Sequence, residues 1–215
     1  MQRLTLATLL LLSLFSGLSV ASPALLSAPS SGSVLNGQIE LLEDVGGQLS
    51  IADMADPAVQ SRFQPAAGRT SVGQSSNPWW IKLSLQRASD APAQWWLEVG
   101  AVTLLDLQIF LPSATDQWQR RQAGERVGFA AGRDHDYRRA VFRLPPLGEQ
   151  AQTIYLRTFD PAGNSFPLRI WQLHDLEQLA KREHLVLGLI YGVILALLLY
   201  NLFILLALRD PAYLW

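Results

Sequence analysis

The 215-residue chain has no cysteine and almost no net charge, and both features restrict its chemistry. Without cysteine it forms no disulfide, no thiolate metal site and no thiol nucleophile. This lack also suits a protein that is exported from a bacterial cytoplasm. Lys and Arg number 17 and Asp and Glu number 18, giving a formal net charge of −1. Such a balance does not support a nucleic-acid partner, which would require a basic surface.

Patterns typical of catalytic and metal sites are also missing. The histidines, His135, His174 and His184, lie far apart, and none pairs with another at a metal-ligand spacing such as HxxxH. The sequence contains no GxSxG nucleophile elbow, no HExxH and no glycine-rich phosphate loop. We therefore expect no catalytic residue, no metal site, no cofactor and no enzyme activity.

Residues 185–208 form a long run without Asp, Glu, Lys or Arg. At 1.5 Å rise per residue, a helix of this length crosses a hydrocarbon core of about 30 Å. The run is expected to be helical because lipid offers no partners to the backbone. A buried helix of a soluble core is the alternative, but such helices usually carry a polar stripe. We expect residues 176–184 to be a polar helical linker and residues 209–215 to begin a cytoplasmic loop, where the chain stops.

Residues 1–21 have the features of a secretory signal peptide. Arg3 supplies the positive start, an apolar stretch follows, and Ser19-Val20-Ala21 has small residues where a signal peptidase cleaves. An uncleaved anchor is the alternative, and either places the next segment in the periplasm, on the outer side of a bacterial inner membrane. Residues 22–33, rich in Ser, Pro and Ala, are expected to be a linker.

Residues 34–175 show short segments of alternating polarity separated by Gly, Pro, Asp and Ser. This pattern predicts an all-β antiparallel sandwich of about eight strands, with a jelly roll as the best specific expectation. A short helical turn within residues 51–63 is expected, with Pro57 at its first position after Asp53 or Asp56. The expected strands are Val34–Glu43, Trp79–Leu85, Gln94–Val99, Leu104–Leu111, a short return at Trp118, Arg138–Leu144, Thr153–Phe159 and Pro167–Leu173.

Alternation assigns one face of these strands to the core. The residues expected to point inward are Trp79, Ile81, Leu83, Trp95, Leu97, Leu107, Ile109, Phe142, Ile154, Leu156 and Leu168.

The seven tryptophans are many for a chain of this length, and some fall on the opposite face. Trp80, Trp96 and Trp118 are candidates for lining an open sheet that binds a glycan or small molecule, because indole rings stack on the apolar face of a sugar. The alternative is that they are packing anchors with arginines lying over them. The expected ligand-binding residues are Trp80, Lys82, Trp96, Glu98, Arg133, Tyr137, Arg139 and Arg157.

The apolar run also carries a helix-packing pattern. Gly188, Gly192 and Ala196 recur every four residues, and small residues at this spacing allow another helix to approach closely. We expect contact with sister helices or a homodimer, with Asn201 forming an interhelical hydrogen bond.

Several stretches together resemble the bacterial 7TMR-DISM membrane sensors. They are Leu41-Leu42-Glu43-Asp44, Gly73 to Leu85, Trp96 to Val99, Gly128 with Arg133, Arg139 to Leu144, Thr153 to Arg157, Pro167 to Trp171, Leu187 to Leu202 and Leu208 to Leu214. The resemblance implies a periplasmic sensory domain of the second extracellular type, with a jelly-roll fold similar to carbohydrate-binding modules. It also implies a seven-helix membrane module that usually leads to a cytoplasmic histidine kinase or diguanylate cyclase.

The chain departs from that family pattern because it stops a few residues after the first membrane helix. A fragment or a truncated gene is expected, and no kinase or cyclase motif is present to carry over. Two functions remain open. The first is the ligand-sensing portion of a signalling receptor. The second is a membrane-tethered module that binds an envelope glycan or a partner protein without signalling output. An exported hydrolase is a distant third.

Overall fold

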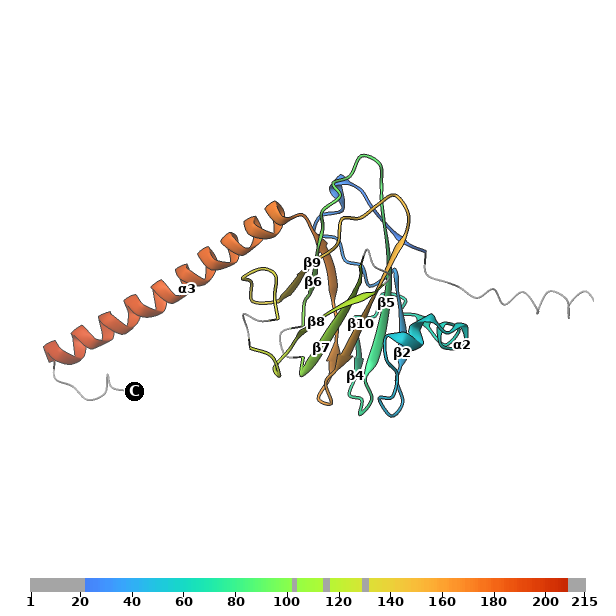
Figure 1. Cartoon of the computed structure of the whole chain (residues 1–215). Coiled ribbons are helices and arrows are strands. Elements are labelled where there is room, and N and C mark those ends of the chain that lie inside the picture. Colours follow the sequence, from blue (N-terminus) through green and yellow to red (C-terminus); the bar gives the residue numbers. More distant parts are fainter. Residues whose placement is uncertain (1–21, 102–103, 114–116, 129–131, 209–215) are drawn as a thin grey trace, which may run out of the picture.

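A β-sandwich followed by one long helix makes up the described part of the chain (Figure 1). The computed structural model describes residues 22–101, 104–113, 117–128 and 132–208. This arrangement confirms the expected fold class, antiparallel sheets followed by an apolar helix. The expected signal peptide at residues 1–21 and the expected cytoplasmic loop at residues 209–215 lie outside the described residues.

The larger sheet has seven strands in the order β3-β2-β5-β10-β7-β8, with β1 also paired to β5. All its pairings are antiparallel except that of β1, which runs parallel to β5. Its strands are β1 (Ala24–Leu26), β2 (Ile39–Glu43), β3 (Gln64–Pro65), β5 (Trp79–Arg87), β7 (Asp106–Pro112), β8 (Trp118–Ala123) and β10 (Gln152–Phe159).

The smaller sheet has three antiparallel strands in the order β12-β6-β9. They are β6 (Trp96–Val99), β9 (Ala140–Arg143) and β12 (Leu168–Trp171), and β4 (Ser71–Gly73) pairs separately with β11 (Asn164–Ser165). The described residues thus contain more strands than expected, because segments of two or three residues are too short to show alternation. The first long strand begins at Ile39, whereas Val34 makes only an isolated bridge to Arg169.

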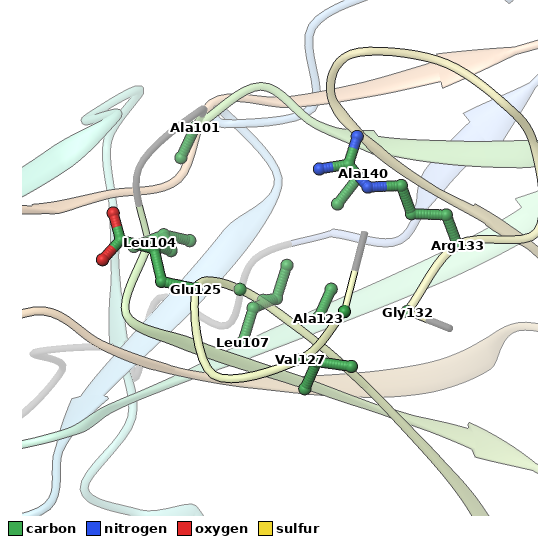
Figure 2. A pocket seen from close by; sticks show the side chains of 11 residues that line it. Ala101, Leu104, Leu107, Ala123, Glu125, Val127, Gly132, Arg133 and Ala140 are labelled. Atoms are coloured by element: carbon green, nitrogen blue, oxygen red, sulfur yellow. The ribbon is translucent and has the colours of Figure 1, made fainter. Parts of the chain in front are cut away.

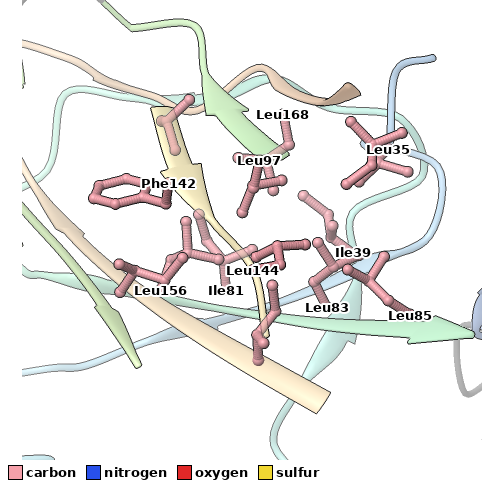
Figure 3. Packing of buried hydrophobic residues seen from close by; sticks show 14 of the residues in the cluster. Leu35, Ile39, Ile81, Leu83, Leu85, Leu97, Phe142, Leu144, Leu156 and Leu168 are labelled. Atoms are coloured by element: carbon pink, nitrogen blue, oxygen red, sulfur yellow. The ribbon is translucent and has the colours of Figure 1, made fainter. Parts of the chain in front are cut away.

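The main core fills the space between the two sheets (Figure 3). Leu83 and Leu156 come from the larger sheet, and Leu97, Phe142 and Leu168 come from the smaller one. All residues expected to point inward belong to this core, except that Trp79 is only partly buried against it. Alternation therefore identified the core side of each long strand correctly.

The segment 22–33, expected as a linker, is instead part of the sandwich. β1 pairs with β5, and η1 (Ala28–Ser30) follows it. Ala24 and Leu26 are buried in the main core, while Leu25 between them is exposed. Three residues of strand give no readable periodicity among Ser, Pro and Ala, so the composition suggested a linker.

Residues 49–63, here called the covering segment, lie over the outer face of the larger sheet. They contain η2 (Ala52–Ala55) and α2 (Pro57–Gln60). The Asp56 side chain accepts a hydrogen bond from the Ala58 N–H, and Pro57 occupies the first helical position. Of the two expected caps, Asp53 and Asp56, Asp56 is therefore the one that caps α2. Met54, Val59 and Phe63 pack against the sheet and form a second apolar cluster.

The long helix α3 (Leu173–Leu208) joins the expected linker and the expected membrane run without a break. Leu176 is buried on the outer face of the smaller sheet, whereas the side chains from Leu185 to Leu189 are exposed. Its most apolar 18-residue stretch has a mean hydropathy of 2.6, so the helix is long and apolar enough to cross a membrane. Its first turns are therefore docked on the sandwich and the rest projects away from it (Figure 1).

Leu83→Ala should lower the free energy of unfolding by about 2–5 kcal/mol, because it removes buried methyl groups from the centre of the core. The Leu83 side chain is 0% exposed. Urea denaturation of the detergent-solubilised chain, followed by circular dichroism, measures the change. The matched control is Leu25→Ala on β1, which should shift stability by less than about 0.5 kcal/mol. Equal losses in the two variants would contradict this description of the core.

Candidate ligand site on the larger sheet

The outer face of the larger sheet carries two rows of polar and aromatic residues. Cross-strand pairing joins Trp80 to Arg157 and Arg157 to Gln108. The next row on the same face joins Lys82, Tyr155, Phe110 and Arg120. Residues two apart along a strand share a face, so both rows point away from the main core.

Part of these rows, Trp80, Arg157 and Gln108 with Phe110 and Arg120, forms the floor of a cavity of about 360 Å³, here called the sheet-face pocket. Its volume falls within the range of small-molecule sites. The covering segment supplies one wall and β8 supplies the other. The lining residues are Leu49, Ser50, Ile51, Trp80, Gln108, Phe110, Trp118, Arg120 and Arg157.

Trp80 lies at the base of this pocket and is 0% exposed. Its ring stacks on Phe110 with 5.4 Å between centroids, and Met54, Val59 and Phe63 belong to the same cluster. Its indole N–H donates to Asp44 Oδ2 at 3.4 Å. The expectation that Trp80 lies on an open sheet is therefore wrong, because the side chain is buried as a packing anchor. Its contact with a ligand stays a prediction. Alternation identifies the face of a residue, but it does not reveal whether another segment covers that face.

Arg157 lies between two buried carboxylates at the edge of the pocket. Its terminal nitrogens are 3.8 Å from Asp44 Oδ2 and 3.9 Å from Asp106 Oδ2. Asp106 also accepts hydrogen bonds from Gln108 at 2.8 Å and Gln122 at 2.6 Å. Among the described residues, the buried Arg157 Nε has no hydrogen-bond partner. The terminal nitrogens lie beyond hydrogen-bond distance of both carboxylates, so they retain donors for the oxygens of a ligand.

The rim of the pocket is formed by the aromatic side chain of Trp118 on one side and by the loop around Ser50 on the other. Trp118 is 36% exposed and meets Tyr155 edge-on, with 5.4 Å between ring centroids. Across from it, the Ser50 hydroxyl donates to Asp53 Oδ2 at 2.7 Å. This hydrogen bond and that from the Ser50 backbone N–H hold the pKa of Asp53 below its ordinary value. The loop wall is therefore fixed by local hydrogen bonds.

Lys82 shares the outer face but does not line the sheet-face pocket. Its ammonium pairs with Glu40 at 2.9 Å and lies 5.7 Å from the centre of the Phe63 ring. These contacts give Lys82 a place in packing the covering segment. In the described part of the chain, no group of three His, Asp or Glu side chains is arranged to hold a metal ion.

Other expected ligand residues lie on the opposite side of the molecule, on the outer face of the smaller sheet. We call them, with two partners, the helix-docking cluster. Its members are Trp96, Glu98, Tyr137, Arg139, Trp171 and Leu176.

Glu98 is the buried centre of the helix-docking cluster, with only 1% of its side chain exposed. It accepts hydrogen bonds from Arg139 Nη1 at 2.7 Å and from the Trp171 indole N–H. A buried carboxylate requires such partners because desolvation otherwise disfavours its charge. The Tyr137 hydroxyl donates to Glu183 Oε2 of α3 at 2.9 Å. Burial, reinforced by this hydrogen bond, raises the pKa of Tyr137. These residues therefore hold the helix in place and do not face the sheet-face pocket.

Arg133 lies in a third place, a cavity of about 250 Å³ beside β7, β8 and β9 (Figure 2). Its guanidinium reaches toward Ala140 and donates to the Tyr137 carbonyl. Burial lowers the pKa of Arg133, and the nearby Asp136 opposes that effect. Gly124 and Gly132 form part of the wall. A Cβ added at Gly124 would lie 2.8 Å from Leu104 O, and one added at Gly132 would lie 2.7 Å from Gln122 O, so there is no room for a side chain at either position. Glu125 and Arg133 are the charged side chains in its lining, whereas the sheet-face pocket is lined by Ser50, Gln108, Arg120 and Arg157.

The expected ligand residues are thus dispersed over the molecule. Trp80, Arg157 and the candidate Trp118 line the sheet-face pocket. The sequence pattern did not single out Ser50, Gln108, Phe110 or Arg120 as ligand residues. Their grouping follows from the pairing register of β5, β10, β7 and β8, which one sequence does not reveal.

The expected helix-packing residues lie exposed on α3. Gly188, Gly192, Ala196 and Asn201 touch no other element among the described residues, and a Cβ added at Gly188 or Gly192 would meet nothing within 4 Å. Their role in helix association stays a prediction.

Two family models match consecutive parts of the chain. Residues 36–172 match the domain described as 7TMR-DISM extracellular 2, which covers nearly all of the sandwich. Residues 183–215 match the domain described as 7TM diverse intracellular signalling, which begins within α3. No curated protein matches the chain. Because the first match alone spans well over half of the sequence, the chain belongs to the 7TMR-DISM family, membrane receptors of signal transduction with an extracellular sensing domain.

Proposed function

We propose that this chain is the periplasmic ligand-sensing portion of a receptor in the bacterial inner membrane, and that the sheet-face pocket binds a carbohydrate-like ligand. The observation that supports this most strongly is the meeting of an exposed aromatic ring, Trp118, with the donors of Arg157 in one concave site. A sugar offers both an apolar ring face and hydroxyl oxygens, so it matches both kinds of group.

The pocket chemistry suits recognition with little rearrangement. Trp118 offers a partly exposed indole for stacking, while Gln108 and Arg120 add amide and guanidinium donors beside Arg157. Asp44 and Asp106 flank the Arg157 guanidinium, so less side-chain freedom is lost when a ligand binds. The two carboxylates also offset its charge, which favours a neutral polar ligand over a strongly anionic one.

The receptor assignment is favoured over a simple membrane tether by the match of residues 183–215 to the seven-helix signalling domain. The output expected of such a receptor is a histidine kinase or a diguanylate cyclase. Within this chain, we propose a binding role without catalysis.

Trp118→Ala should weaken glycan binding by about 1–3 kcal/mol, the scale of losing an aromatic anchor at an interface. Its exposed ring contributes less to packing than the buried Trp80, so the variant should remain folded. The measurement is binding of the full chain in detergent to a panel of immobilised neutral and uronic-acid-containing oligosaccharides, with the melting temperature recorded for each variant.

Gln119→Ala is the matched control, because Gln119 is exposed on the same strand but points to the opposite side. It should leave both binding and melting temperature unchanged. Glycan binding by the original chain that survives Trp118→Ala would move the ligand to another site. No binding to any member of the panel would contradict the carbohydrate assignment.

A further inference from the structure

A loop of the sandwich is attached to α3 close to the start of the apolar run. The Tyr137 hydroxyl donates to Glu183 Oε2 at 2.9 Å, and Arg138 Nη2 lies 2.9 Å from Glu183 Oε1. Figure 1 shows the loop before β9 approaching the first part of α3. Tyr137 and Arg138 of this loop thus both bind the Glu183 carboxylate of the helix.

The position of Glu183 along α3 sets the height of this loop above the lipid. Glu183 precedes Leu185, the first residue of the apolar run, by two residues, which is about 3 Å along a helix axis. A bilayer of about 40–45 Å has a hydrocarbon core of about 30 Å, which leaves about 5–7 Å for headgroups on each side. The apolar run of about 36 Å exceeds the core slightly, and a tilt accommodates the difference. Glu183 and the loop attached to it therefore lie at headgroup depth.

The side chains at this depth have an excess of positive charge. Arg138 is 51% exposed, and Lys181 and Arg182 are exposed on the last helical turn before the apolar run. In the described part of the chain, neither Lys181 nor Arg182 lies within ion-pair distance of a carboxylate. Basic side chains at a membrane surface are attracted to anionic lipids.

We propose that Arg138, Lys181 and Arg182 form a juxtamembrane basic surface that binds anionic phospholipid headgroups and seats the sandwich directly on the bilayer. The partner is the lipid surface on the extracellular side, recognised by the phosphate charge of its headgroups. This inference depends on the membrane helix and the loop contact, and it is independent of any ligand in the sheet-face pocket.

The chain has no cysteine, so a single introduced thiol can be labelled cleanly. Asp136→Cys places an uncharged fluorophore on the exposed loop beside Tyr137, and Ser61→Cys places it after α2 as the control. Each full-length variant is incorporated into nanodiscs of phosphatidylcholine alone or mixed with phosphatidylglycerol. A small fraction of lipid carries a nitroxide quencher on its headgroup. Short and long fluorescence lifetimes then report docked and undocked populations.

We expect quenching at position 136 but little at position 61, with a larger docked population when phosphatidylglycerol is present. Neutralising Lys181 and Arg182 together to Gln should reduce the docked-to-undocked ratio in phosphatidylglycerol by about fivefold for each charge removed. Arg62→Gln with Arg69→Gln, which removes two charges near α2, should not change it. Equal quenching at positions 136 and 61 would overturn the seating. Quenching at position 136 that is the same in both lipids would overturn anionic recognition.

Discussion

Replacing Trp80 with alanine is expected to lower the free energy of unfolding by about 3–5 kcal/mol, the range for removing a large aromatic side chain from a core. Trp80 is fully buried, stacks on Phe110 and supports the covering segment through Met54 and Val59. Its removal leaves a cavity that neighbours fill only partly. Since small domains are stable by about 5–15 kcal/mol, much of the stability would be lost.

Trp118→Ala is the matched control, because it makes the same change on the same face of the sheet at an exposed position. Urea denaturation of the two detergent-solubilised variants, followed by the β-sheet signal in circular dichroism, compares them directly. We expect Trp118→Ala to cost about 1 kcal/mol or less, the scale of one aromatic contact. A larger loss for Trp118→Ala than for Trp80→Ala would mean that the assignment of packing anchor and exposed ring is reversed.

Glu98→Ala should also be strongly destabilising, because it leaves Arg139 and the Trp171 indole N–H without their shared acceptor. Breaking a buried ion pair costs about 3–5 kcal/mol, and the 24% exposure of the Arg139 side chain favours the lower end. The loss of stability should be greatest where α3 docks on the smaller sheet. We therefore expect faster hydrogen exchange of the backbone amides of residues 174–184, measured by mass spectrometry.

Glu149→Ala is the control for this second change, since Glu149 is 65% exposed and lies 3.8 Å from Arg87. A surface pair of this kind should contribute less than about 1 kcal/mol. Adding Arg139→Ala to Glu98→Ala should cost less than the sum of the two single changes, because the uncompensated charge disappears. Strict additivity, or unchanged exchange at the start of α3, would contradict the docking role of Glu98.

Alternation within a strand was enough to predict which side of each long strand faces the core. Ile81, Leu83, Leu97 and Phe142 were placed correctly because a strand buried on one side must alternate in polarity. The same pattern also placed Trp80 and Trp96 correctly on the outer faces of their strands. It contained no information on the segments that cover those faces, the covering segment over Trp80 and the first turns of α3 over Trp96.

The candidate site was only partly predictable because its members are far apart in sequence. Ser50, Gln108 and Arg157 meet only once β2, β5, β10 and β7 are paired in register and the covering segment has folded over them. Basic and aromatic residue types pointed equally to Arg139 and Arg157. Burial beside Glu98 gives Arg139 a structural role, whereas Arg157 opens onto a cavity. That distinction depends on tertiary contacts.

The sheet-face pocket and the helix-docking cluster lie on opposite sides of one packed core. Any coupling between ligand and membrane helix must therefore pass through interdigitated side chains such as Leu83, Leu97 and Phe142, which do not compress freely. Such coupling is reciprocal: whatever factor a ligand applies to the equilibrium between helix positions, the helix and its surroundings apply to the affinity for that ligand. The lipid around α3 would then act as a second effector of the pocket, and ligand affinity would depend on the membrane in which it is measured.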